Sequence, residues 1–270
     1  MKEVAELPIG IFDSGIGGLT VLKEILKQVP YENTVYLGDT ARVPYGIRSP
    51  ETVTRYSFEN TRFLISKGIK FLVVACNTSS SISLADLKKN FSFPMTGVLE
   101  PGARAAVSQT RTGRIVVIGT EATIKSRAYT KAIKAFNDSI EVTEIACPLF
   151  VPLVEEGWTE GDIARLVAEK YLSTIKGTDI DTLVLGCTHY PMLRNVIGQI
   201  LGEGVTLIDS GVETAREVRQ ILETNDIIRR SSKDSQRKFF VTDSPEKFIS
   251  TGEKFLRHKI THISKIELGG

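Results

Sequence analysis

The sequence predicts an α/β fold with two pseudo-symmetric domains, each a mostly parallel sheet flanked by helices, and with the functional site in the cleft between them. Short apolar runs of strand length alternate along the chain with segments whose apolar residues recur at helical spacing. This alternation is typical of parallel sheets covered by helices on both faces. Near residue 114 the same series begins again, which indicates two related domains.

The repeat is supported by the places where the strands of the two series end. Corresponding end points are separated by a nearly constant number of residues, although the side chains themselves differ. The corresponding positions are Phe12 and Ile118, Gly38 and Ala146, and Cys76 and Cys187, which lie 106, 108 and 111 residues apart. A nearly constant offset over three elements is expected of a duplicated domain.

The first series predicts four buried strands separated by helices. The strands are expected over 8–12, 34–38, 71–75 and 95–98. One helix follows Gly17 and Gly18, and another is expected after the strand over 71–75. A third helix is expected between the strands over 34–38 and 71–75. Ser49 and Pro50 predict its start, because Ser is a favoured N-cap and Pro fits the first helical position. Gly68 is a natural end for that helix.

The second series and a C-terminal tail complete the two domains. Strands are predicted over 114–118, 140–146, 182–186 and 205–208, and helices over 122–136 and 159–175. The tail predicts a helix from Gly211, a strand over 238–241, a helix over 245–257 and a strand over 260–266. Because this tail is too small to stand alone, we expect 210–270 to return to the first domain, 1–97, with 98–209 as the second domain. The polar residues 229–235 are interpreted as a solvated loop rather than a phosphate or nucleic-acid site.

Composition and charge exclude several classes of function. The 270 residues are 41% hydrophobic and carry a net charge of +2. Proteins that bind nucleic acids usually have a marked excess of basic residues, so we expect no nucleic-acid partner. No apolar run approaches the roughly 20 residues of a bilayer span, and the first residues show no secretory signal. Three cysteines, an odd number, predict free thiols and a cytoplasmic protein rather than a disulfide framework.

Polar residues gather directly after the predicted strands. In open parallel sheets, ligands bind beyond the carboxyl ends of the strands. These positions hold Asp13 and Ser14, Asp39, residues 44–46, Cys76 to Ser79, Thr120, Thr123, Cys147, and Cys187 to His189. Each series therefore contributes one thiol at the same strand end.

The paired thiols of Cys76 and Cys187 are the candidate reactive groups. Cys76 is expected at a helix N-terminus, where backbone N–H groups and the helix dipole favour the thiolate and lower the pKa. The alternative for Cys76 is a small buried apolar residue. Cys187 recurs at the equivalent strand end, with His189 close enough to act as a hydrogen-bonding or cationic partner. Cys147 is followed by Pro148 and has no acid–base residue nearby, so we interpret it as a packing residue.

Three interpretations that involve a metal or cofactor fit these residues poorly. Residues 13–18 are similar to a dinucleotide fingerprint with Asp39 as the ribose acid, but Thr20 replaces the third glycine and Asp13 would face the pyrophosphate. Cys187 and His189 lack the second ligand pair of a zinc site. No lysine stands at these strand ends to bind pyridoxal phosphate. We therefore expect neither a metal nor a cofactor.

Two thiols on opposed domains can invert a carbon stereocentre. One removes a proton from one face of the carbon, and the other returns a proton to the opposite face. Their ordinary pKa of about 8.5 lets one be a thiolate while the other stays protonated. Hydroxyls at the helix starts can hold substrate carboxylates, and those hydroxyls belong to Ser14, Thr78, Ser79, Thr120, Thr123 and Thr188.

Five blocks of the sequence, taken in order, resemble the cofactor-independent glutamate racemases. They are residues 10–19 (GIFDSGIGGL), 43–46 (VPYG), 75–78 (ACNT), 152–157 (PLVEEG) and 186–191 (GCTHYP). The resemblance covers essentially the whole chain. It implies interconversion of L- and D-glutamate without a cofactor, supply of D-glutamate for peptidoglycan, and a homodimer. It also implies two α/β domains with the C-terminal segment returning to the first.

The resemblance also implies roles for individual residues. Cys76 would act on the D enantiomer and Cys187 on the L enantiomer, and the side chains that assist them would be Asp13, Glu155 and His189. The substrate site would be lined by Asp13, Ser14, Pro44, Tyr45, Gly46, Asn77, Thr78, Thr123 and Thr188, and Thr120 is added by its place after a strand. The assignment of Glu155 to the site depends on the resemblance alone, because an acidic pair before a glycine otherwise predicts a solvated helix end.

The sequence leaves two other functions open. A related cofactor-free racemase could act on aspartate or another acidic amino acid. A two-domain protein could instead bind such an amino acid without changing it, since one fold hosts several functions. Binding alone needs no pair of thiols, so the sequence favours a racemase.

Overall fold

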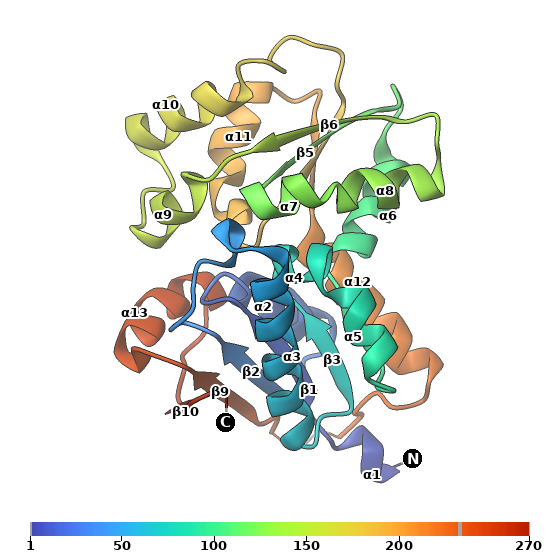
Figure 1. The fold of residues 1–270 in the computed structure, drawn as a ribbon, viewed down its shortest axis with the longest axis vertical. Helices are drawn as coiled ribbons and strands as arrows, with labels where there is room; N and C mark the ends of the chain where they lie inside the picture. The colour runs from blue at the N-terminus through green and yellow to red at the C-terminus, as the bar shows by residue number, and fades with distance from the viewer. Residues whose placement is uncertain (1, 232–233, 270) are drawn as a thin grey trace.

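The structure, a computed structural model that describes residues 2–231 and 234–269, consists of two sheets covered by helices (Figure 1). The larger sheet occupies the lower half of the view and the smaller sheet the upper half. Within the described residues every strand pair is parallel. The predicted α/β class, with two parallel sheets flanked by helices, is confirmed.

The six-stranded sheet combines strands from both ends of the chain. Its strands are β1 (Ile9–Asp13), β2 (Thr34–Gly38), β3 (Phe71–Val74), β4 (Met95–Gly97), β9 (Arg237–Val241) and β10 (Ile263–Lys265). Their order across the sheet is β10-β9-β2-β1-β3-β4. The strands β1, β2 and β3 are buried over their whole length, as expected for strands covered on both faces.

The four-stranded sheet repeats the arrangement of the first four strands. Its strands are β5 (Arg114–Gly119), β6 (Glu141–Ala146), β7 (Thr182–Gly186) and β8 (Thr206–Asp209), in the order β6-β5-β7-β8. The first four strands of the chain have the matching order β2-β1-β3-β4. In both sheets the first strand therefore lies between the second and the third. The third strands, which precede Cys76 and Cys187, occupy equivalent places.

Helices cover both faces of the sheets. They are α1 (Lys2–Ala5), α2 (Leu19–Gln28), α3 (Pro50–Ser66), α4 (Asn77–Ile82), α5 (Leu84–Asn90), α6 (Leu99–Gln109), α7 (Glu121–Ser126), α8 (Ala128–Phe136), α9 (Phe150–Glu155), α10 (Gly161–Leu172), α11 (Arg194–Leu201), α12 (Ser210–Thr224) and α13 (Pro245–Leu256), with the 3₁₀ turns η1 (Tyr45–Ile47) and η2 (Tyr190–Leu193). The predicted cap of α3 is confirmed, because the N–H of Thr52 donates to the Ser49 hydroxyl at 3.3 Å. Among the described residues, no helix is both long and apolar enough to cross a bilayer.

Alternate residues of β1 enter two different hydrophobic cores. Ile9 and Ile11 pack with side chains of α2, α12 and α13, whereas Phe12 packs in the core beneath α3 and α5. The first core continues under the smaller sheet, where Val116 and Leu185 belong to it. One apolar interior therefore joins the two sheets and fixes their strand ends relative to each other.

Three predicted elements differ from the structure, and one of them, the helix expected over 159–175, is only shorter, because α10 spans Gly161–Leu172. The helix expected over 122–136 is broken into α7 and α8 at Arg127, which has a left-handed conformation with φ of 55°. The Ser126 hydroxyl accepts a hydrogen bond from the N–H two residues later at 3.2 Å, a local bond that competes with the helix. The last strand is shorter than the expected 260–266, because the N–H of Ile260 binds a glutamate side chain instead of a strand.

The interpretation of residues 229–235 as a solvated loop is wrong for Arg229. Residues 232 and 233 lie outside the described part of the chain. Arg229 is buried, and its guanidinium donates to the Glu6 carboxylate at 2.8 Å and to the Tyr31 carbonyl at 2.6 Å. Its charge is thus used to hold the returning C-terminal segment against the N-terminal residues.

A buried ion pair reinforces this junction. Lys70, which precedes β3, lies 2.6 Å from the Glu32 carboxylate, and both side chains are almost completely buried. The Lys70 ammonium also donates to the carbonyls of Ala5 at 2.7 Å and Ile227 at 2.8 Å. Charges removed from water in this way are tolerated only with such partners, so breaking the set is costly.

Replacing Lys70 with Met should lower the free energy of unfolding by about 3–5 kcal/mol, because the Glu32 carboxylate would stay buried without its cation. Urea unfolding measures the change. Lys89→Met is the matched control, since Lys89 pairs with Asp86 in an exposed position and should cost less than about 0.5 kcal/mol. Equal small losses in the two variants would contradict the importance of the buried pair.

Candidate active site

The two predicted thiols stand at equivalent ends of equivalent strands. Cys76 follows β3 and is the N-cap of α4, and Cys187 follows β7. Both side chains are buried, with 5% and 6% of their surface exposed. The charge of Cys187 contributes to raising the pKa of Cys76, so the two sulfurs lie within electrostatic reach of one another. The strand duplication therefore brings them to one site.

Cys187 belongs to a chain of three polar side chains. Its Sγ lies 3.8 Å from Nδ1 of His189, and Nε2 of the same ring lies 3.1 Å from Oε1 of Glu155. Glu155 is the last residue of α9. The ring of Phe255, from α13, packs edge-on against the imidazole with centroids 5.7 Å apart. The imidazole of His189 thus contacts the sulfur through one ring nitrogen and the carboxylate through the other.

The electrostatics of this chain favour a protonated imidazole. Burial lowers the pKa of His189, but the Cys187 sulfur and the Glu155 carboxylate outweigh burial and raise it to about 10. For Glu155 burial acts in the opposite direction and raises the pKa. His189 and the Lys247 ammonium of α13 outweigh it and bring the pKa of Glu155 below its ordinary value. At neutral pH an imidazolium therefore lies beside the Cys187 sulfur and stabilises negative charge there.

Cys76 lies in a contrasting environment. Asp13, the last residue of β1, is fully buried, and its Oδ2 accepts a hydrogen bond from the N–H of Gly15 at 2.9 Å. Its Oδ1 has no hydrogen-bond partner among the described residues. Burial raises the pKa of Asp13, although His189 and the N–H groups of the following turn oppose this. The hydroxyl of Ser14 lies 3.9 Å from the Cys76 Sγ.

The expected depression of the Cys76 pKa is wrong for the substrate-free protein. Burial and the charge of Asp13 raise this pKa to about 12, although the N–H and hydroxyl of Ser79 at the helix start favour the thiolate. The desolvation of a buried thiolate outweighs the helix terminus. Cys76 is consequently a protonated thiol at neutral pH, while Cys187 lies beside a cation.

Three threonine hydroxyls meet where the two halves touch. The Thr78 Oγ1 lies 3.0 Å from that of Thr120 and 3.3 Å from that of Thr123, which are themselves 3.0 Å apart. Thr78 comes from α4, and the other two come from the start of α7. These predicted residues are therefore brought together next to Cys76.

The glycine-rich turn after β1 contacts the Cys187 side. A Cβ on Gly17 would lie 2.5 Å from the His189 ring and even closer to the Thr188 hydroxyl, so only glycine fits there. The Thr20 hydroxyl donates to the Thr188 carbonyl at 2.8 Å. This contact fixes the loop that carries Thr188 and His189 against the first half.

The loop over 43–46 is placed only in part as expected. Gly46 lies against Thr120, because a Cβ there would be 2.6 Å from the threonine Cβ. Tyr45 is buried, but its hydroxyl donates to the Asp39 carboxylate and accepts from the Asn60 amide at 3.1 Å. Its hydroxyl is thus turned away from the threonines. Pro44 is exposed.

Several residues near the site were missed by reasoning from the sequence. Phe255 and Lys247 come from the returning helix α13, and Tyr129 of α8 donates a hydrogen bond from its hydroxyl to Asn77 Oδ1 at 2.6 Å. No local pattern marks these residues, because each reaches the site from an element distant in sequence. Cys147 is buried with its sulfur 3.8 Å from the Ile145 carbonyl, in agreement with a packing role.

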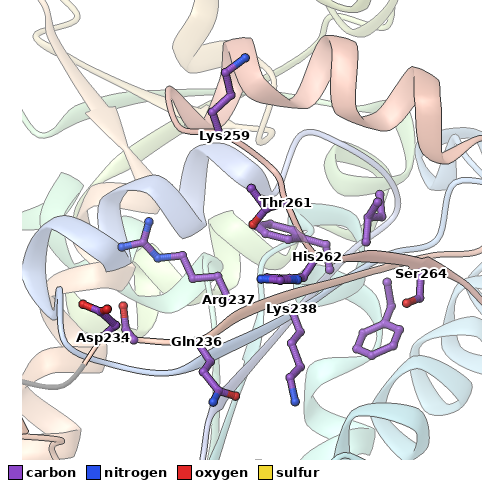
Figure 2. A pocket seen from close by; sticks show the side chains of 12 residues that line it. Asp234, Gln236, Arg237, Lys238, Lys259, Thr261, His262 and Ser264 are labelled. Carbon is purple, nitrogen blue, oxygen red and sulfur yellow. The ribbon is translucent and has the colours of Figure 1, made fainter.

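A groove of about 990 Å³ lies apart from these residues, along β9 and β10 (Figure 2). Arg237 and His262 project to one side of the strands in this view, and Gln236 and Lys238 to the other. None of the predicted site residues lines the groove. Within the described part of the chain, no group of three or more His, Cys, Asp or Glu residues is arranged to hold a metal ion.

Comparison with known proteins agrees with this geometry. The family model described as Asp/Glu/Hydantoin racemase matches residues 9–218, which is well over half of the chain. The chain belongs to this racemase family. The resemblance predicted from the five sequence blocks is thereby confirmed, and an Asp/Glu/Hydantoin racemase is an isomerase.

Individual relatives of this racemase are similar over nearly their whole length. A glutamate racemase of Geobacter metallireducens is 56% identical over 260 residues, which is 96% of each chain. A crystal structure of glutamate racemase from Francisella tularensis with D-glutamate has a TM-score of 0.92 and 37% identity, covering 97% of this chain and 98% of that one. A glutamate racemase structure from Bacillus anthracis has a TM-score of 0.93 and 41% identity, covering 97% of each chain.

The protonation of His189 in this racemase gives a direct prediction. Its imidazole should remain protonated through neutral pH and titrate near pH 10, and Glu155→Gln should lower that pKa because the neutral amide stabilises the cation less. Nuclear magnetic resonance of ¹³C-labelled histidine measures the titration. Of the three histidines, the signal that His189→Gln removes is the one to follow.

The same shift predicts the pH dependence of stability. Because the folded pKa of His189 is raised, its contribution is complete below the ordinary value of 6.5 and is lost as the pH rises through about 10. The stability advantage of wild type over His189→Gln should therefore shrink between these pH values. A wild-type His189 that titrates near its ordinary pKa would contradict this electrostatic account.

Proposed function

We propose that the protein is a glutamate racemase that inverts the α carbon of glutamate by proton transfer between Cys76 and Cys187, without a cofactor. The observation that carries the proposal is the pair of cysteines at equivalent strand ends in opposite electrostatic environments. Relatives named as glutamate racemases, 44–56% identical over nearly the full chain, support glutamate as the substrate.

In the L-to-D direction, Cys187 acts as the base. Its sulfur, stabilised by the imidazolium of His189, accepts the α proton of L-glutamate as the C–H bond breaks. The Cys76 thiol then delivers its proton to the opposite face, and the new C–H bond completes D-glutamate. After this turnover Cys187 is protonated and Cys76 is a thiolate, so the enzyme is set for the reverse direction. The buried carboxyl of Asp13 and the Glu155–His189 pair assist the two sulfurs.

Hydroxyls and an amide around the two sulfurs hold the substrate carboxylates in this proposal. The Nδ2 atom of Asn77 is buried and has no hydrogen-bond partner in the described part of the chain, so it is available to a ligand oxygen. The proposed lining consists of Asp13, Ser14, Pro44, Tyr45, Gly46, Asn77, Thr78, Thr120, Thr123 and Thr188. For Tyr45 we assign the role to its ring and backbone, because its hydroxyl is bound to Asp39.

The cellular role and location belong to the same proposal. We infer that the product supplies D-glutamate for peptidoglycan, as the resemblance implies, and that the enzyme works in the cytoplasm. Cys76, Cys147 and Cys187 are all free thiols, which supports a reducing compartment. The small net charge of +2 supports a small-molecule substrate rather than a nucleic-acid partner.

We also propose the division into a first domain of 1–97 with 210–270 and a second domain of 98–209. Sheet membership supports it, since β9 and β10 extend the sheet of β1 to β4 while β5 to β8 form their own. The cleft between these domains would hold the substrate.

A homodimer is the proposed assembly. Four apolar side chains of the α9–α10 region are about half exposed, and such surfaces are typical of protein interfaces. They are Leu149 (53%), Trp158 (51%), Ile163 (52%) and Leu166 (58%). The wild type should therefore have about twice the 29.7 kDa mass of one chain by light scattering, and Leu166→Glu should shift it toward the monomer. A monomeric wild type at micromolar concentration would contradict the assembly.

Removing either thiol should abolish racemisation. Cys76→Ala and Cys187→Ala should each lower the rate by at least about 10²–10⁴-fold, the usual contribution of a positioned acid or base. Polarimetry on L-glutamate without added cofactor measures the rate, and aspartate at the same concentration tests the substrate.

The buried third cysteine provides the control for these variants. Cys147→Ala removes a buried thiol that has no part in the proposed proton transfer and lies against the Ile145 carbonyl, so its racemisation rate should remain within about threefold of wild type. Undiminished turnover after loss of Cys76 or Cys187, or faster turnover of aspartate, would refute the proposal.

A further inference from the structure

Tyr129 of α8 connects the two cysteine-bearing strand ends. Its ring lies against Gly186, the residue before Cys187, since a Cβ on that glycine would be 3.3 Å from the tyrosine Cε2. Its hydroxyl reaches Asn77, the residue after Cys76, and donates to Oδ1 at 2.6 Å. Only 1% of the tyrosine surface is exposed. A single rigid side chain thus contacts the backbone beside one sulfur and the side chain beside the other.

The hydrogen bond from Tyr129 determines which way the Asn77 amide points. An amide side chain has one accepting oxygen and one donating nitrogen, so an oxygen bound to a hydroxyl leaves the nitrogen on the other side. That nitrogen, Nδ2, is buried and has no hydrogen-bond partner among the described residues. A buried donor without a partner costs about 1–3 kcal/mol, which a ligand oxygen would recover.

The environment keeps the tyrosine hydroxyl a donor. Burial raises the pKa of Tyr129 above its ordinary value, although the neighbouring Ser210 hydroxyl opposes this. The phenol is therefore neutral at neutral pH. Because water is excluded from this contact, no solvent molecule competes for the Asn77 oxygen.

We propose that Tyr129 is a positioning residue that orients the Asn77 amide so that Nδ2 donates a hydrogen bond to a carboxylate oxygen of the substrate. This inference rests on the proposed racemase function and deepens it. Tyr129 touches no reacting atom; it acts through Asn77 on substrate binding. The bond is made equally to bound substrate and transition state, so its loss affects KM rather than kcat.

Tyr129→Phe in the 270-residue chain tests the inference, because it keeps the ring and removes only the hydroxyl. The KM for L-glutamate and for D-glutamate should each rise about tenfold, while kcat stays within about threefold. In an Asn77→Ala background, Tyr129→Phe should have no further effect on KM, since the amide that it orients is gone. Independent, multiplying effects of the two substitutions would overturn the inference.

Two further variants keep the test decisive. Asn77→Asp retains the acceptor for Tyr129 but lacks the donor, so it should raise KM at least as much as Tyr129→Phe; an unchanged KM would overturn the inference even if the tyrosine variant failed to fold. Tyr190→Phe is the matched control, because this buried hydroxyl donates to the Cys147 carbonyl at 2.9 Å. It should lower thermal stability and leave KM within about twofold of wild type.

The outcomes separate this inference from the proposed function. Wild type that racemises glutamate, together with a Tyr129→Phe variant of unchanged KM, would overturn only the role of Tyr129. Wild type that neither binds D-glutamate in calorimetry nor racemises it would overturn the function and the inference with it.

Discussion

Burying charge at the junction of two sheets is the constraint on which the site depends. An imidazole flanked by a sulfur and a carboxylate keeps its proton even though burial opposes it, and His189 is in that position. Cys76 lies beside a buried carboxyl instead, and both its burial and the charge of Asp13 raise the pKa of its thiol, which therefore keeps its proton. Two residues of the same type therefore lie in different electrostatic surroundings, Cys76 beside a carboxyl and Cys187 beside a cation. A proton can move between such groups in one direction and then in the other.

Duplication of the strand arrangement supplies the geometry for this pair. Because β3 and β7 have the same place in their sheets, the residues that follow them arrive at equivalent points. The shared core beneath α2 and α12 and the contact of Gly17 with His189 hold those points together. The C-terminal helix α13 adds Phe255 against the imidazole, so the segment that extends the first sheet also completes the surroundings of Cys187.

Much of this arrangement could be predicted from the sequence because strand ends are encoded locally. Apolar runs mark the strands, and the polar residues that follow them include both cysteines, His189 and the threonines. The raised pKa of Cys76 could not be predicted, since it depends on burial and on Asp13 from another strand. Arg229 was misjudged for the same reason: its partners lie almost 200 residues or more away in sequence. Tyr129 carries no motif, and its role follows from two contacts that only the fold creates.

The central claim is that two different groups handle the proton on the two faces of the carbon. Conversion of L-glutamate in deuterated water, followed by mass spectrometry of both enantiomers at early times, tests it most directly. Two bases predict D-glutamate that carries solvent deuterium at the α carbon from the first turnovers, while the remaining L-glutamate stays largely unlabelled. D-glutamate that retains the original α hydrogen would mean that one group serves both faces, and it would contradict the account.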